Sequence, residues 1–326
     1  MRGKSWFQLA LWLGMTMTQV LQVARAAGNG ETVQVLDTGR GTLDGSLRLP
    51  EGTAPAPWPV ALIIAGSGPT DRDGNSAVLP GRNNGLRMLA DALAAVGIAS
   101  LRYDKRGVGA SAQAAPVEAR LRFDDYVDDA VAWARWLAAD PRFSSVGVVG
   151  HSEGALIGLL SAQRGPAAWY VSIAGPAQPA SALLRRQLQD RLPPPLADTS
   201  EAILQSLERG ETVAEVPVPL MALYRPTVQP YLVSWFRHDP AKSIAGFAKP
   251  CLIVQGDTDI QVATDDARVL QAAQPACGLQ LVAGMNHVLK PVPADPGQQR
   301  MSYSDPILPL APGLIPALTD FILRVR

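Results

Sequence analysis

The sequence predicts an α/β protein with a mostly parallel sheet of eight strands and helices on both faces. Short apolar runs typical of strands occur at 32–37, 41–48, 60–64, 98–102, 146–149, 170–174, 251–255 and 279–282. Segments with helical spacing of apolar residues lie between or after them, at 86–96, 124–138, from 153 onward, 265–273 and 314–323. Strands alternating with helices indicate a parallel sheet covered on both faces.

The alternation of strands and helices stops between residues 175 and 250. This segment contains two helical patterns, at 182–192 and 200–209, and an aromatic-rich stretch at 224–236. Because no strand pattern interrupts it, we expect a helical insertion that lies over the ends of the strands.

Composition excludes several classes of protein. The 326 residues are 47% hydrophobic and carry 29 Lys+Arg against 29 Asp+Glu. A chain this apolar is expected to fold, and a balanced charge lacks the basic surface that nucleic acid requires, so no nucleic-acid partner is expected. No stretch of about eighteen residues is free of polar side chains, which argues against a membrane-spanning helix.

The first residues resemble a secretory signal peptide. Arg2 and Lys4 precede a largely apolar stretch at 7–20, and Ala24 and Ala26 place small residues where a signal peptidase cleaves. We predict cleavage after Ala26, a signal peptide at 1–26, a domain at 27–326, and an exported protein, periplasmic or secreted, with no stable membrane span after cleavage. An uncleaved amphipathic anchor is the alternative. No cysteine precedes Cys251, which excludes a lipid-anchored lipoprotein.

Two cysteines are expected at the starts of neighbouring strands. Cys251 opens one apolar run and Cys277 shortly precedes the next. In an exported protein such a pair indicates a possible disulfide. Two buried free thiols are the alternative.

The chemistry is indicated most sharply by Gly150-His151-Ser152-Glu153-Gly154, directly after a strand and before a helix. This G-x-S-x-G pattern is a nucleophile elbow, a turn so tight that only small residues fit two positions before and after the serine. The following helix N-terminus favours negative charge beside Ser152. The alternative is a serine in an ordinary glycine-rich turn.

A serine nucleophile needs a histidine base and a carboxylate that orients it. Of three histidines, His151 is expected to point away from Ser152, and His238 lies in the predicted insertion. His287 follows the last strand, where a loop would present it to the serine. The acid should lie between serine and histidine, and Asp257 and Asp259 both follow the strand at 251–255.

Backbone N–H groups must also stabilise the oxygen of the substrate. The strand at 60–64 runs into a glycine-rich loop, and we expect the N–H groups of Ser67 and Glu153 to form this oxyanion hole. Gly68 and Arg72 are candidates for the substrate pocket, although Arg72 could instead pair with the aspartates beside it. The segment 104–111 is expected to shape the loop beside the nucleophile.

The elbow, the glycine-rich loop, the segment 104–111, the acid and the final histidine, in this order, resemble the α/β-hydrolase superfamily. The branch they are most similar to contains bacterial serine-aminopeptidase-like and monoacylglycerol-lipase-like hydrolases, and the likeness covers about residues 30–326. It implies an α/β-hydrolase fold with a cap at about 178–248. It also implies that the acid is Asp259, three residues after Gly256. The oxyanion loop departs from the family pattern, because Ala65-Gly66 replaces His-Gly, so only its backbone role carries over.

These residues predict a serine hydrolase that cleaves carboxylic esters of modest size through an acyl-enzyme. Its substrate would be a small-molecule ester, and the reaction needs no metal or organic cofactor. Tyr224 and Trp235 in the cap are candidates for an apolar acyl pocket. An aminopeptidase, amidase or thioesterase with the same residues is the alternative, and a non-hydrolytic ligand-binding protein is a reading from another class.

Overall fold

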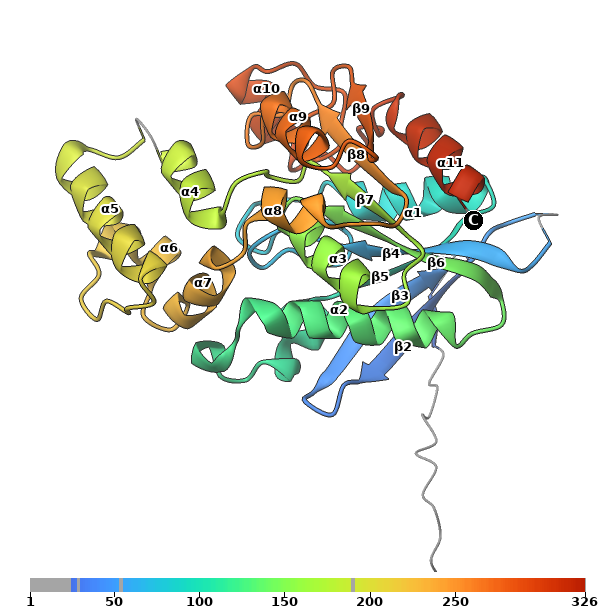
Figure 1. Ribbon diagram of the computed structural model, residues 1–326, viewed down its shortest axis with the longest axis horizontal. Coiled ribbons are helices and arrows are strands. Elements are labelled where there is room, and N and C mark those ends of the chain that lie inside the picture. Colours follow the sequence, from blue (N-terminus) through green and yellow to red (C-terminus); the bar gives the residue numbers. More distant parts are fainter. Residues whose placement is uncertain (1–24, 28–29, 53–54, 189–190, 326) are drawn as a thin grey trace, which may run out of the picture.

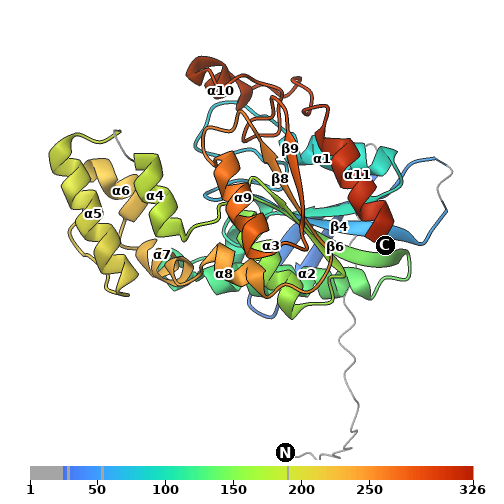
Figure 2. The ribbon, with the colours of Figure 1, turned by 45° about the horizontal axis from the view of Figure 1, so that its top comes forward.

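The computed structural model describes residues 25–27, 30–52, 55–188 and 191–325 (Figure 1). Residues 1–24 of the predicted signal peptide therefore lie outside the described residues. The described chain forms a twisted sheet with helices on both faces and a helical lobe to one side (Figures 1 and 2). The predicted α/β fold class is confirmed.

Nine strands of the described residues form one sheet, in the order β1-β2-β3-β5-β4-β6-β7-β8-β9. The strands are β1 (Arg25–Ala27), β2 (Glu31–Asp37), β3 (Thr42–Arg48), β4 (Trp58–Ile64), β5 (Ala99–Tyr103), β6 (Phe143–His151), β7 (Trp169–Ile173), β8 (Cys251–Gly256) and β9 (Gly278–Val282). The first three are antiparallel to their neighbours, and the strands from β5 to β9 run parallel. The eight predicted strands are present, and the additional β1 includes Ala26, after which cleavage is predicted.

The two faces of the sheet bury separate apolar cores. Along β4, Val60, Leu62 and Ile64 belong to one core, whereas Ala61 and Ile63 belong to the other. This alternation follows from the two-residue period of a strand, whose successive side chains point to opposite faces. Both faces therefore need helices to cover them, as the apolar strand sequences predict.

Helices α1 (Gly85–Ala95) and α11 (Leu314–Val325) cover one face, and α2 (Phe123–Ala138), α3 (Glu153–Arg164) and α9 (Thr264–Ala273) cover the other. In α2 the positions predicted from helical spacing, including Val127, Ala130 and Leu137, are buried. The short α10 (Pro296–Ser302), which the sequence pattern did not indicate, lies between β9 and α11. No helix in the described ranges is long and apolar enough to cross a membrane.

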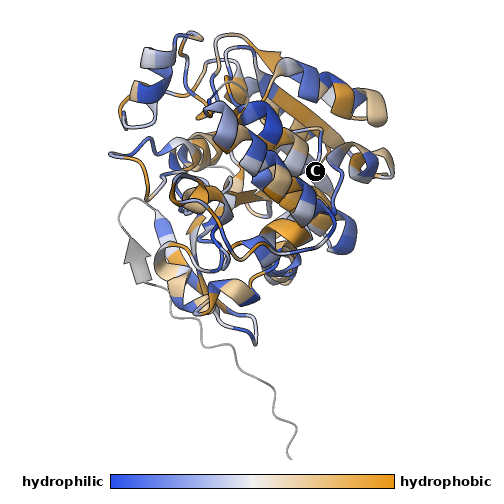
Figure 3. Ribbon diagram, turned by 90° about the vertical axis from the view of Figure 1, so that its left-hand side faces the viewer, coloured by the Kyte–Doolittle hydropathy of each residue, from blue (hydrophilic) through white to orange (hydrophobic). Residues whose placement is uncertain are grey.

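The helical lobe is formed by the segment between β7 and β8. It contains α4 (Ala180–Leu188), α5 (Pro194–Glu208), the 3₁₀ turn η3 (Val218–Leu220), α6 (Met221–Tyr224), α7 (Gln229–Phe236) and α8 (Pro240–Ala245). Helix α7 packs on α2, where the Phe123 N–H donates to Ser234 Oγ at 2.8 Å and the Trp235 ring stacks on Phe123. Hydrophobic and hydrophilic residues alternate along the lobe's helices (Figure 3), as expected for helices that bury one side.

A disulfide joins Cys251 and Cys277 across two neighbouring strands. Leu252 of β8 lies opposite Gly278 of β9, so the two cysteines occupy adjacent positions just before this pair, with Cα atoms 4.6 Å apart. The parallel pairing therefore accounts for the bridge. It ties β9, at the edge of the sheet, to β8.

Replacing both cysteines with alanine is expected to lower the free energy of unfolding. A cross-link between residues 26 positions apart restricts the unfolded chain and is worth about 3 kcal/mol. Denaturant unfolding of the oxidised protein and of Cys251→Ala/Cys277→Ala measures the difference. Thiol titration of the unfolded, unreduced protein should find no free thiol, and two free thiols would contradict the bridge.

Candidate active site

Ser152 lies in the turn between β6 and α3 with an unusual backbone conformation. Its φ is 56° and its ψ is −120°, a combination that non-glycine residues rarely adopt. The Ser152 N–H donates to the Ile173 carbonyl oxygen at 2.9 Å, which ties the turn to the neighbouring β7. The turn therefore holds the serine at the carboxyl end of an interior strand, immediately before a helix N-terminus.

The glycines on either side of Ser152 allow this turn to pack. A Cβ on Gly150 would lie 2.1 Å from the Gly154 carbonyl oxygen, and a Cβ on Gly154 would lie 2.4 Å from the Ile64 carbonyl oxygen. These distances are far below van der Waals contact, so any side chain would force the turn or β4 to move. The geometry agrees with the steric reason for the G-x-S-x-G pattern.

His287 and Asp259 lie together on the loops after β9 and β8. The Nδ1 atom of His287 is 2.8 Å from Oδ2 of Asp259, and both side chains are almost fully buried. The Gln261 and Val262 N–H groups donate to the other carboxylate oxygen at 2.7 and 3.0 Å. Burial raises the pKa of Asp259, but the His287 charge and these hydrogen bonds outweigh it and hold the pKa below its ordinary value.

Asp257, the other candidate acid, is used differently. Its Oδ1 accepts a hydrogen bond from the Gly284 N–H at 2.6 Å, so it ties the loop after β8 to the loop after β9. Of the two aspartates left open by spacing, the structure thus brings Asp259 to His287. Asp257 has the turn-stabilising contact typical of aspartate in loops.

His151, the residue directly before Ser152, lies against His287. Its ring lies 4.9 Å from the His287 ring, and its Nε2 is 2.8 Å from the His287 carbonyl oxygen, to which it donates. Burial and the neighbouring His287 charge lower the pKa of His151 to about 4, so the ring is neutral at pH 7. His238 lies in the lobe, 3.5 Å from Asp124.

The loop after β4 passes close to Ser152. A Cβ on Gly66 would lie 3.2 Å from the Ser152 Cβ, closer than most Cβ contacts, so glycine suits this close approach. Among the described residues no acceptor binds the N–H of Ser67, the next residue. Glu153 opens α3, where the first N–H groups of a helix lack an intrahelical partner. Of the two predicted oxyanion-hole donors, Glu153 thus follows the nucleophile in the chain, and Ser67 lies near it in space.

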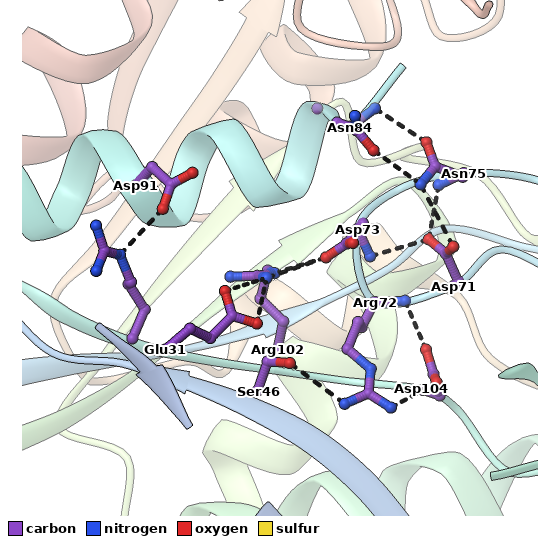
Figure 4. Close-up of polar contacts among 12 residues, drawn as sticks. Glu31, Ser46, Asp71, Arg72, Asp73, Asn75, Asn84, Asp91, Arg102 and Asp104 are labelled. Carbon is purple, nitrogen blue, oxygen red and sulfur yellow. Dashed lines mark hydrogen bonds and ion pairs between the residues drawn. The ribbon is translucent and has the colours of Figure 1, made fainter. Parts of the chain in front are cut away.

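Polar contacts hold this loop in shape (Figure 4). Asp71 Oδ1 accepts from the N–H groups of Asp73 and Asn75, both at 2.9 Å. Asn75 Oδ1 in turn accepts from the N–H groups of Asn83 and Asn84, also at 2.9 Å. The loop is therefore closed on itself by side-chain to backbone hydrogen bonds.

Two arginines tie the same loop to the strands below it (Figure 4). Arg72 donates to Asp104 at 2.8 Å, and the Arg72 N–H donates to the other oxygen of this carboxylate. Arg102, on β5, lies 3.0 Å from Asp73 and 3.1 Å from Glu31. Arg72 therefore forms an ion pair, but with Asp104 and not with the aspartates beside it.

A cavity of about 170 Å³ opens at Ser152 and His287. Its walls come from the loop after β4, the start of α1, and the loops after β8 and β9. The lining residues are Gly66, Ser67, Thr70, Gly74, Ser76, Leu79, Asn83, Gly85, Leu86, His151, Ser152, Gln261, His287, Val288, Leu289 and Tyr303.

None of the four residues predicted for the substrate pocket lines this cavity. Tyr224 is buried within the lobe, with its hydroxyl 2.9 Å from Ser200 Oγ. Trp235 stacks on Phe123 with ring centres 5.8 Å apart. Gly68 is exposed beside the cavity, and Arg72 is held by Asp104. The aromatic residues of the lobe pack against one another and against the rest of the protein, which buries their apolar surface.

No sequence motif indicated two of the residues that line the cavity. Gln261 donates through Nε2 to the Tyr303 hydroxyl oxygen. They come from loops 42 positions apart, and neither belongs to a motif. Only the folded arrangement of the loop after β8 and the end of α10 brings this pair to the cavity.

The sheet topology, the serine turn on an interior strand, and the histidine and aspartate on later loops define an α/β hydrolase. The profile described as "Serine aminopeptidase, S33" matches residues 83–290, and the chain belongs to that family. The resemblance read from the motifs is confirmed.

Known proteins similar to this chain include an esterase and an α/β hydrolase. Esterase EstD of Thermotoga maritima is 29% identical over 227 residues, which are 70% of this chain and 52% of EstD. The chain thus spans about half the length of this curated relative. Est1E from Butyrivibrio proteoclasticus has a TM-score of 0.56 at 16% identity, covering 90% of this chain and 98% of Est1E. The α/β hydrolase GrgF from Penicillium sp. sh18 has a TM-score of 0.54 at 18% identity, covering 79% and 91%. These two likenesses concern the fold.

The buried His151 is expected to make stability depend on pH. Its folded-state pKa lies at about 4, below its value of 6.5 when solvated. As pH falls below 6.5, the unfolded chain takes up a proton that the folded protein does not, so stability is lost as pH falls toward 4. The loss from this residue is about 3 kcal/mol.

Denaturant unfolding of the wild type and of His151→Gln between pH 7 and pH 4.5 isolates this contribution. The variant keeps an amide donor for the His287 carbonyl oxygen but cannot titrate. Its free energy of unfolding should decline less steeply with falling pH. Parallel curves for the two proteins would contradict the assignment.

Proposed function

We propose that this protein is a serine carboxylesterase. Ser152 Oγ attacks the carbonyl carbon of the ester, and His287 takes its proton. Because Nδ1 of His287 is bound to Asp259, Nε2 is the nitrogen that receives it. The negative oxygen of the tetrahedral intermediate accepts hydrogen bonds from the Ser67 and Glu153 N–H groups. Its collapse releases the alcohol, which His287 protonates, and water then hydrolyses the acyl-enzyme.

The observation that carries this proposal is the convergence of three elements on one cavity. Ser152 and His287 both line it, and His287 is bound to the buried Asp259. A protein that only bound a ligand would have no need for a strained serine next to an oriented histidine. The named activity of EstD gives further support to ester hydrolysis.

Esters are favoured over peptides with a free amino terminus by the charge of the cavity. An aminopeptidase must bind a substrate ammonium group, for which a carboxylate is the natural partner. None of the described residues that line the cavity is acidic. In the lobe, Glu201 and Glu208 are both paired with Arg185. The cavity therefore suits a neutral substrate.

The size of the cavity favours small acyl or alcohol groups. Pockets for drug-sized ligands usually measure about 300–1,000 Å³. The 170 Å³ found here is close to the size of a cavity of about 150 Å³ that holds one benzene ring. We infer that the bound group is short.

We also propose that the protein is exported. The signal-like pattern at 1–26 and the disulfide between Cys251 and Cys277 support this, since disulfides persist in oxidising compartments. N-terminal sequencing of the protein from extracellular or periplasmic fractions tests it. A start at Ala27 is expected, and a start at Met1 would contradict the proposal.

Hydrolysis of p-nitrophenyl acetate, butyrate and octanoate should show a preference for the two shorter acyl groups. The octanoyl chain exceeds the cavity and must remain partly in solvent. Ser152→Ala should abolish turnover with all three. Turnover that persists in this variant would contradict the nucleophile, and turnover only of amino-acid amides would favour the peptidase alternative.

Asp259→Asn is expected to lower kcat by about 10⁴-fold, because an amide cannot hold His287 in the required tautomer or stabilise its charge. The matched control is Asp257→Asn, which alters the neighbouring loop contact to Gly284 and should leave kcat within a few-fold of wild type. Steady-state kinetics with p-nitrophenyl butyrate compare the two variants. Equal losses would show that Asp259 has no special role.

A further inference from the structure

A fully buried ion pair lies directly beside the nucleophile turn. Lys105 Nζ is 2.6 Å from Oε2 of Glu153, and the two side chains are 1% and 2% exposed. Burying two charges costs solvation energy that their attraction often fails to repay, so such a pair is weak evidence for stabilisation of the fold. Its other contacts suggest what it does.

Lys105 also binds the backbone of the oxyanion loop. Its Nζ donates to the Gly66 carbonyl oxygen at 2.5 Å and lies 5.1 Å from the centre of the Tyr126 ring. The remaining oxygen of Glu153 accepts a hydrogen bond from the Tyr231 hydroxyl, on α7 of the lobe. Lys105 and Glu153 thus have partners at each charged end, in a place without access to water.

The Gly66 carbonyl and the Ser67 N–H belong to the same peptide group. A trans peptide is planar, and its C=O and N–H point in opposite directions. An ammonium group that holds the carbonyl oxygen therefore also fixes the direction of the Ser67 N–H. Gly66 lies against Ser152, and the Ser67 N–H has no acceptor among the described residues. A cation at the carbonyl oxygen also polarises the peptide and makes its N–H a stronger donor.

Glu153 supplies the second donor of the oxyanion hole through its own N–H. Its carboxylate, left alone, would oppose negative charge on the substrate oxygen, and Lys105 neutralises it at 2.6 Å. Lys105 therefore contacts both residues whose N–H groups would bind that oxygen, from loops that follow different strands.

We propose that Lys105 is the positioning residue of the oxyanion hole, which orients the Gly66–Ser67 peptide and balances the charge of Glu153. This inference rests on the proposed esterase function. Lys105 does not touch the substrate in this role. It acts through the two backbone donors, so its loss should affect the transition state and not substrate binding.

The test compares Glu153→Gln with Lys105→Met/Glu153→Gln. The single variant keeps Lys105 beside Gly66 but leaves its buried ammonium group without a carboxylate partner, whereas the double variant removes both charges and the contact to Gly66. With p-nitrophenyl butyrate, we expect kcat of the double variant to be about 10- to 100-fold below that of Glu153→Gln, somewhat less than the loss of a whole oxyanion donor. KM should stay within about twofold, because the acyl cavity is unchanged.

A second readout separates positioning from general damage. A trifluoromethyl ketone adds to the serine and forms a tetrahedral oxyanion, so its inhibition constant should rise by the same factor as kcat/KM falls. The matched control is Arg106→Met/Asp129→Asn, which removes a buried ion pair of 2.5 Å whose contacts do not reach the Gly66–Ser67 peptide. When kcat is calculated per active site that can be titrated, the kcat of this control variant should equal that of the wild type.

Three results would overturn the proposal. Equal kcat in Glu153→Gln and the double variant would remove Lys105 from the oxyanion hole while leaving the esterase intact. If kcat of the Arg106→Met/Asp129→Asn control fell as much as that of the double variant, the effect of Lys105 would be one of packing and not of positioning. Absence of Ser152-dependent turnover in the wild type would overturn the proposed function and this inference with it. If the double variant does not fold, Lys105→Arg carries the same test: kcat reduced at unchanged KM supports positioning, and unchanged kcat contradicts it.

Discussion

The constraint on which the site depends is the backbone of Ser152. Its left-handed conformation is held by close packing at Gly150 and Gly154 and by the bond to β7. Such a conformation costs about 1–3 kcal/mol and persists only where its surroundings enforce it. Once it is fixed, α3 begins beside the serine, and Gly66 lies close to the serine side chain. The positions of the two N–H groups that we propose as oxyanion donors follow from this single turn.

The pairing of β8 with β9 is the second organising feature. One register places Cys251 beside Cys277 at one end of the strands and the Asp259 and His287 loops together at the other. A Cβ on Gly256 would lie 1.9 Å from the Met285 carbonyl oxygen, so the two loops diverge from almost touching backbones. The bridge and the histidine–aspartate pair are thus two results of one strand pairing.

Much of this could be predicted from the sequence because the signals are local. The strands, the serine turn and His287 each have a motif or a period. No local motif or period marks the cavity or the Lys105 contact, because their residues are distant in the sequence. Gln261 and Tyr303 are 42 positions apart, and Lys105 and Gly66 are 39 positions apart. For the aromatic residues of the lobe, apolar composition alone cannot distinguish packing from ligand binding. Tyr224 and Trp235 are buried by their own neighbours.

None of the described residues of the lobe lines the cavity, yet the lobe reaches the serine turn through the Tyr231 hydroxyl, which donates to Glu153. In the proposed esterase, selectivity and rate would therefore depend on separate parts of the molecule. The loops after β4, β8 and β9 would decide which group fits, whereas the insertion would act on the charge at the serine turn through Tyr231. Divergence of the insertion would accordingly tune turnover while the range of accepted substrates stayed constant.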